Sequence, residues 1–416
     1  MTGKLSRLRA LREESGMAAT KNTELFTGMD ERRTVSARLQ QFAITRKRSP
    51  AGARMSAAQL CHQLEGRLVA AGVIYAAHHL PQPVSVGQAV IDEAALGAVA
   101  YLLGAARMPR RLVVIDTETT GLAGGTGTVA FVIGALELAA RELRLHQWVL
   151  TRFQGEQAAL EALAEVLQRC DAIVSYNGAS YDLPLLETRF RLAGLPLRFC
   201  ETTHLDLLPR VRRAFAGRWP DCKLQRAEQK LLSRVRADDL PGAEVPIQWF
   251  NWMRYGDGSG MRAVVRHNRD DVLGLAALLA PLARVYADPG TYGARVAAVL
   301  RDRVDEGELY AALRRFRVQL DDTDTLELAR LAKRAGAWFH AEAALTTLAE
   351  QGHAVAAEQL AKLYEHQLKQ LPRALELTRM LLRRAPYMPG LKRREDRVLR
   401  KLAAAAAPHR CAGQLV

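Results

Sequence analysis

Two acidic residues stand one position apart at the end of an apolar run, in the segment VIDTETTGLAGGTGT at 114–128. Alternate side chains of a strand point to the same side, so we expect Asp116 and Glu118 to share one face and Thr117 to point the other way. Two carboxylates on one face repel each other unless a cation lies between them, and Mg²⁺ and Mn²⁺ prefer oxygen ligands. The pair therefore predicts a divalent-metal site, although a strand that ends in two solvated acids has the same pattern.

Two later segments carry further groups that suit such a site. SYNGASYD at 175–182 ends a predicted strand and places Asp182 at the start of a predicted helix, where a helix cap is the simpler interpretation. HNRDDV at 267–272 belongs to a predicted helix and places His267 and Asp271 four residues apart, hence on one face. Taken alone, the first segment is equally consistent with a helix cap and the second with an ordinary solvated helix. The metal site is therefore predicted from the presence of all three segments in one chain.

The hydrophobic period predicts the elements that position these groups. Three strands in succession suggest an antiparallel meander, and a fourth strand is flanked by two amphipathic helices. We therefore expect an α/β fold with a mixed sheet and helices on its faces. The strands are predicted at 111–119, 129–138, 143–153 and 171–177, and the helices at 156–169 and 182–194.

The order of these motifs, DxE at a strand end, then NxxxYD, then HxxxD on a later helix, resembles the three motifs of the DEDD 3′–5′ exonucleases. More narrowly, TGLAGGTGT, NGASYDLPLL and DLPGAEVPIQWFNWMRYGDG at 239–258 resemble the YprB-like ribonuclease H-like proteins. The resemblance covers roughly residues 65–285. It implies a ribonuclease H-like mixed sheet flanked by helices.

The resemblance also implies the residues of the site and its cofactors. Two ions, Mg²⁺ or Mn²⁺, would be held by Asp116, Glu118, Asp182 and Asp271. Such a pair of ions activates a water molecule and stabilises the leaving 3′ oxygen of a phosphodiester. The terminal nucleotide of the substrate would lie near Thr119, Gly121, Leu122 and Asn177.

A histidine marks one departure from the DEDD pattern. These enzymes divide by whether a tyrosine four positions before the last acid, or a histidine five before it, handles the proton of the water. Here His267 occupies the place four before Asp271, a pattern shared by the YprB-like subgroup. His267 is therefore predicted to assist the nucleophile, since a neutral imidazole can take a proton at physiological pH, or else to hold the helix only.

The net charge of +15 favours a polyanionic partner, and we expect DNA or RNA. A basic cluster at 203–213, continued by Lys223, Arg226 and Lys230, is either a phosphate track or a solvated helix face. The aromatic residues between these motifs favour core packing over stacking on bases. They are Trp249, Phe250, Trp252 and Tyr255.

Composition also narrows the class of protein. Five scattered cysteines without a CxxC pair suggest neither a zinc site nor a disulfide framework, which indicates a cytoplasmic chain. No apolar run approaches the length that spans a bilayer, and the N-terminus has no signal-peptide core, so a membrane role is not expected.

The C-terminal third is rich in alanine, leucine and charge and has helical periods. LARLAKRAGAWFHAEAAL at 328–345 aligns with LAKLYEHQLKQLPRALEL at 360–377, which predicts helical-hairpin repeats that resemble tetratricopeptide (TPR) repeats. Such helices would bind a protein partner or buttress the catalytic domain.

The sequence is expected to divide into six parts. They are a basic flexible leader (1–56), a lead-in segment packed on the catalytic domain (57–110), the ribonuclease H-like domain (111–285), a linker helix (286–302), an all-α TPR-like domain (303–390) and a basic tail (391–416).

These observations favour a metal-dependent hydrolase that removes nucleotides from the 3′ end of DNA or RNA. One alternative is a catalytically weak scaffold that binds nucleic acid through the same fold and uses its helical repeats to bind partners. Another is a structure-specific endonuclease, because the same two-metal chemistry cuts internal bonds.

Overall fold

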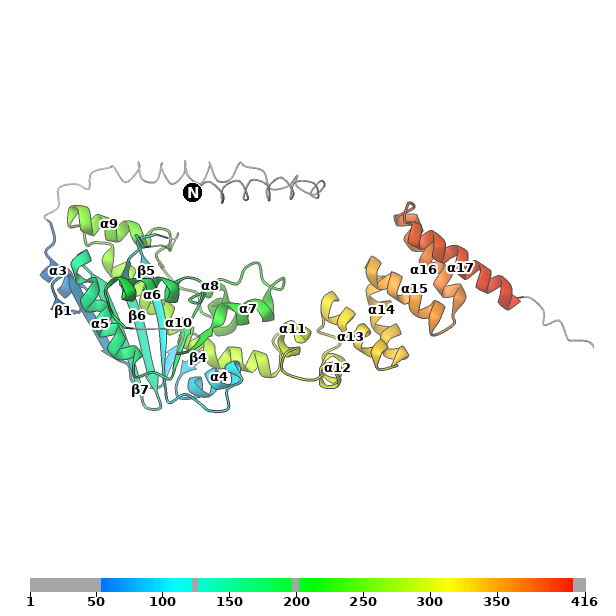
Figure 1. The fold of residues 1–416 in the computed structure, drawn as a ribbon, viewed down its shortest axis with the longest axis horizontal. Coiled ribbons are helices and arrows are strands. Elements are labelled where there is room, and N and C mark those ends of the chain that lie inside the picture. Colours follow the sequence, from blue (N-terminus) through cyan, green and yellow to red (C-terminus); the bar gives the residue numbers. More distant parts are fainter. Residues whose placement is uncertain (1–53, 122–125, 197–201, 407–416) are drawn as a thin grey trace, which may run out of the picture. The chain divides into compact units, whose positions relative to one another are not determined.

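The computed structural model describes residues 54–121, 126–196 and 202–406 (Figure 1). Most of the expected leader, the end of the expected tail and Leu122 lie outside these ranges. Across the described ranges, no helix is both long enough and apolar enough to cross a membrane.

Seven strands form the central sheet in the order β1-β2-β7-β6-β5-β8-β9. Neighbouring strands from β1 to β5 in that order are antiparallel, whereas β5, β8 and β9 are parallel. The predicted meander of three strands and the mixed sheet are therefore confirmed. The bounds are β1 Arg67–Ala70, β2 Val73–His79, β5 Arg111–Thr119, β6 Ala130–Ala139, β7 Glu142–Leu150, β8 Ala172–Ser175 and β9 Thr203–Asp206; β3 Val84–Val86 and β4 Ala89–Ile91 form a separate hairpin.

Helices cover both faces of this sheet (Figure 1). Strand β5 lies between the two layers, which explains its unbroken apolar run. Leu112 and Val114 pack with α4, α7 and α10, while Val113 and Ile115 pack with α3, α5, α6 and α9. The bounds are α3 Ala57–Gln63, α4 Ala94–Leu103, η2 Phe153–Gly155, α5 Glu156–Leu167, α6 Asp182–Leu192, α7 Leu207–Phe215, α8 Leu224–Ala227, the π-helical turn η4 Glu228–Leu232, α9 Val245–Tyr255 and α10 Met261–Ala287.

The C-terminal helices have a hydrophobic core of their own. Each helix from α12 to α17 packs against the next one, as expected for helical hairpins. The two predicted repeat segments fall on the pairs α13–α14 and α15–α16. The bounds are α11 Val296–Leu300, α12 Glu306–Arg315, α13 Asp322–Arg334, α14 Trp338–Glu350, α15 Ala354–His366, α16 Leu371–Arg384 and α17 Pro389–Ala406.

A chain of polar side chains crosses four strands of the sheet. The Tyr75 hydroxyl lies 2.7 Å from Nδ1 of His146, whose Nε2 lies 3.3 Å from Glu137, and Arg111 donates to the same carboxylate. Glu137 is 1% exposed, so its charge depends on these partners. The hydrogen bond from His146, together with Arg111, lowers the pKa of Glu137 to about 2 against the cost of burial.

Replacement of Glu137 by Gln should reduce the free energy of unfolding in a pH-dependent way. A pKa lowered from 4.5 to about 2 contributes stability that is complete above pH 4.5 and is lost as the pH falls towards 2. We expect a loss of about 2–3 kcal/mol at pH 7 that narrows below pH 4.5, measured by urea unfolding. Glu142→Gln, on the same hairpin and more exposed, should cost less than about 1 kcal/mol. An equal, pH-independent loss for both variants would contradict this explanation.

Candidate active site

Three elements bring the predicted acids together at one end of β5. Asp116 and Glu118 lie on the side of β5 that faces α10, as their spacing predicts. Asp271 comes from α10 itself, and Asp182 is the first residue of α6. The charges of the other three acids all act on Asp116, so the four carboxylates share one electrostatic environment.

Asp182 reaches this place from the opposite layer of helices. Thr117 points away from its two acidic neighbours, as expected, and its hydroxyl donates a hydrogen bond to Oδ1 of Asp182. The backbone also approaches closely here, because a Cβ on Gly178 would lie 2.3 Å from Oγ of Ser175. A threonine between two acids thus positions a third acid, which sequence spacing had not indicated.

Asn268 of α10 holds the first acid. Its Nδ2 donates to Oδ2 of Asp116 at 2.9 Å, and its Oδ1 accepts from Gln147 of β7 at 2.9 Å. Because Gln147 also donates to the Val265 carbonyl, the orientation of the Asn268 amide is fixed. Gly134 makes this approach possible, since a Cβ there would lie 2.2 Å from Oδ1 of Asn268.

A buried ion cluster holds the last acid. Arg236, whose side chain is 4% exposed, donates to Oδ1 of Asp271 and also forms two hydrogen bonds with Glu228, at 2.8 and 2.7 Å. Glu228 is fully buried in η4 and accepts from Arg234 as well. A Cβ on Gly274 would lie 1.7 Å from Oε1 of Glu228, so glycine is needed on α10 here. The sequence motifs did not predict this cluster, for which the signal was RVRADD at 234–239, a basic run before two acids.

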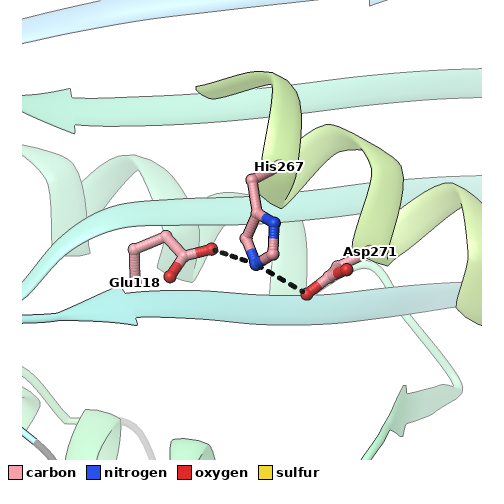
Figure 2. A group of neighbouring side chains, drawn as sticks. All are labelled: Glu118, His267 and Asp271. Atoms are coloured by element: carbon pink, nitrogen blue, oxygen red, sulfur yellow. Dashed lines mark ion pairs between the residues drawn. The ribbon is translucent and has the colours of Figure 1, made fainter. Parts of the chain in front are cut away.

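His267 lies between the two carboxylates on this face (Figure 2). Its Nδ1 lies 2.6 Å from Oδ1 of Asp239, and its Nε2 lies 4.0 Å from Glu118 and 3.7 Å from Asp271. Burial alone would lower the pKa of His267, but Asp271 and the hydrogen bond with Asp239 outweigh burial and raise the pKa. Like Arg236 and Glu228, Asp239 belongs to the site but was not predicted from the sequence motifs.

Comparison with known proteins bears on the fold of the sheet domain. Residues 113–283 match the model of the RNase_H superfamily. The sheet domain has a ribonuclease H-like fold. The uncharacterized protein YprB of Bacillus subtilis (strain 168) is 32% identical over 173 residues, a stretch that spans 40% of this chain and 40% of that protein. The family B DNA polymerase structure from Pyrobaculum calidifontis is matched at 14% identity and a TM-score of 0.32 over 66% of this chain and 35% of that one, a likeness too low to support an argument.

Burial is the main cause of the raised pKa values in the ribonuclease H-like domain's acidic cluster. It raises the pKa of Asp116 well above its usual range, and the charges of neighbouring acids add to the effect. It raises the pKa of Glu118 to about 7 and that of Asp182 to about 6. Bringing these carboxylates together in ionised form therefore costs free energy that a bound cation would offset.

The chemistry of the donor set fits divalent cations. Glu118, His267 and Asp271 each offer one ligand atom, and these atoms lie within 4.8 Å of one another. Glu118 is 9% exposed, and within the described ranges nothing donates a hydrogen bond to its carboxylate. A buried carboxylate without a donor is costly unless a cation accompanies it. Mg²⁺ and Mn²⁺ suit the carboxylate oxygens of this set, so the acids present fit the expected cofactor.

The residues predicted to contact the terminal nucleotide differ in their surroundings. The Thr119 hydroxyl lies 2.7 Å from that of Tyr181, and both side chains bond to the Gly121 carbonyl, so Thr119 is occupied within the protein. Among the described residues, no atom lies within 4 Å of a Cβ built on Gly121. Asn177 is exposed, has a φ of 66° and donates through its backbone to Asp206.

A cavity of about 560 Å³ adjoins the site in the ribonuclease H-like domain. Arg236 and Asp239, which contact Asp271 and His267, line it together with Lys223 and Arg226 of the predicted phosphate track. The prediction of core packing holds for Trp249, Trp252 and the partly buried Phe250, but it is wrong for Tyr255, which is 52% exposed at the end of α9. Trp249 and Trp252 are 0% and 8% exposed and donate to backbone carbonyls of residues 150 and 151.

Replacement of Glu118 by Gln should stabilise the metal-free protein at neutral and alkaline pH. A pKa raised from 4.5 to about 7 means that wild type loses stability as the pH rises through this window, whereas Gln cannot ionise. In chelator, we expect Glu118→Gln to match wild type near pH 4.5 and to exceed it by up to about 3 kcal/mol at pH 8, measured by urea unfolding.

The exposed Glu165→Gln on α5 serves as the control and should show no such pH-dependent gain. Saturating Mn²⁺ should remove the advantage of Glu118→Gln, because the cation offsets the buried charge of wild type. A metal-free Glu118→Gln protein that is less stable than wild type at pH 8 would contradict the proposed cause.

Proposed function

We propose that this protein is a metal-dependent hydrolase of the DEDD type, which removes nucleotides from the 3′ end of DNA or RNA. One observation carries the proposal. Four carboxylates, from a strand end and from helices on both faces of the sheet, share one electrostatic environment. The match to the RNase_H superfamily and the identity with YprB support a nucleic-acid-processing hydrolase in general.

Each part of the site has a defined task in this proposal. Asp116, Glu118, Asp182 and Asp271 would hold the ions, and bound ions supply an activated nucleophile and stabilise the leaving oxygen. Asn268, Thr117 and Arg236 orient three of these acids through the hydrogen bonds described above. The space that the described residues leave beside Gly121 would admit the terminal nucleotide against the backbone.

The basic side of the cavity would position the phosphate backbone. Lys223 and Arg226 line this cavity, and phosphate contacts of this kind fix the register of a strand without reading its bases. Arg226 forms an ion pair with Asp221 at 3.6 Å, which partly neutralises its charge. Lys223 is therefore the stronger candidate for a phosphate contact.

Removal of single carboxylates should abolish turnover and leave the fold intact. Asp116→Asn, Asp182→Asn and Asp271→Asn keep the side-chain volume but remove one anionic oxygen each. We expect each to reduce the rate by at least about a hundredfold in Mg²⁺ or Mn²⁺, because a metal contributes several kcal/mol of transition-state stabilisation. The assay follows 5′-labelled single- and double-stranded DNA and RNA, on which an exonuclease gives a ladder that shortens from the 3′ end.

Asp270→Asn is the matched control for Asp271→Asn. Asp270 is its neighbour on α10 but turns its carboxylate to Arg234, 2.6 Å away, so its activity should stay within a few-fold of wild type. Parental rates in any of the three acid variants at saturating metal would refute the assignment. Internal fragments in place of a ladder would indicate an endonuclease, and binding without cleavage would indicate a scaffold.

The affinity for nucleic acid should fall steeply with salt, since each phosphate contact releases counterions. We expect Lys223→Ala to reduce the slope of log affinity against log salt by about 1. Lys362→Ala, on α15, should leave the slope unchanged. Deletion of residues 1–56 should weaken binding further. The measurement uses the Asp182→Asn protein with labelled oligonucleotides, and affinity that is constant over a fourfold salt range would argue against a basic track.

A further inference from the structure

The imidazole of His267 has only one nitrogen available to the site. Nδ1 lies 2.6 Å from Oδ1 of Asp239, and a carboxylate can only accept, so Nδ1 carries the hydrogen in that contact. The neutral ring therefore directs the lone pair of Nε2 towards Glu118 and Asp271. His267 is 8% exposed, so water has little access to compete for this lone pair.

Asp239 is itself fixed from its other side. Its Oδ2 accepts from Nε2 of Gln225 at 2.9 Å and lies 3.3 Å from Arg236. A carboxylate whose second oxygen is held by Gln225 orients the ring, as the outer carboxylates of metal-binding histidines do.

The distances around Nε2 are too long for hydrogen bonds and short enough for a shared ion. Nε2 lies 4.0 Å from Oε1 of Glu118 and 3.7 Å from Oδ2 of Asp271, beyond the usual limit of about 3.2 Å for a hydrogen bond. Two atoms that each lie about 2.1 Å from one ion are at most about 4.2 Å apart. Both separations fall within that limit.

From this geometry we infer that Nε2 of His267 is a metal ligand, together with Glu118 and Asp271, and that Asp239 is its positioning residue. The inference rests on the proposed function and makes one of the two cation sites a mixed nitrogen and oxygen site. Asp116 and Asp182, whose hydrogen bonds come from Asn268 and Thr117, contribute oxygen ligands only.

Two consequences separate this role from that of a general base. A nitrogen that ligates a cation has no lone pair left to accept a proton from water, so His267 would not take the nucleophile's proton. Imidazole ligands also suit transition metals, whereas Mg²⁺ prefers oxygen. The mixed site should therefore bind Mn²⁺ in preference to Mg²⁺.

Electron spin echo envelope modulation of bound Mn²⁺ tests the inference without reference to activity. The full-length protein receives one equivalent of Mn²⁺ in an excess of Mg²⁺. We expect ¹⁴N modulation from a directly bound imidazole, replaced by a ¹⁵N signal when histidine is ¹⁵N-labelled. His267→Gln should lose the modulation, and the exposed His62→Gln should keep it. The labelled wild type gives a result even if His267→Gln does not fold.

Asp239→Asn separates ligation from positioning. Loss of an outer carboxylate should weaken Mn²⁺ binding by about 10–100-fold and leave the modulation present at saturating Mn²⁺. Bound Mn²⁺ without histidine modulation in wild type, modulation that persists in His267→Gln, or no Mn²⁺ binding at all would overturn the inference. A 3′ ladder without histidine modulation would support the proposed function and refute the ligand role of His267. Histidine modulation without cleavage would support the ligand role and refute the proposed function.

Discussion

Mutual repulsion among carboxylates removed from water is the constraint on which this site depends. Burial raises the pKa values of Asp116, Glu118 and Asp182, so their ionised forms are disfavoured until positive charge or hydrogen-bond donors arrive. The surrounding structure supplies these donors unevenly. Asp116 and Asp182 each accept a side-chain hydrogen bond, whereas Glu118 faces His267 with no donor from the described residues. The least compensated acid therefore lies where a cation would be held most strongly.

Helix α10 connects the site to the core. Its later turns pack into the hydrophobic core beneath the sheet, and its earlier residues carry Asn268, His267 and Asp271. Two glycines remove side chains where polar groups must come close, Gly134 beside Asn268 and Gly274 beside Glu228. The same close packing that stabilises the domain thus holds three functional side chains in place.

A layer of charge lies behind the site and balances it. Arg236 is buried between Glu228 and Asp271, and a buried arginine with two carboxylate partners is costly to disturb because each partner would be left unpaired. This cluster also forms one wall of the cavity that contains Lys223. Arg236, which orients Asp271, and Lys223, which would contact phosphate, therefore line the same cavity.

The sequence predicted the order and type of the elements from β5 to α6, because hydrophobic period and turn residues act over a few positions. It also determined which side chains share a face within one element, such as Asp116 with Glu118 and His267 with Asp271. The contacts between side chains of different elements depend on the tertiary structure. Thr117 bonds Asp182 across 65 positions, Arg236 bonds Asp271 across 35 and His267 bonds Asp239 across 28. A hydrophobic period over a few residues cannot predict such hydrogen bonds, because they depend on how two layers of helices pack on the sheet.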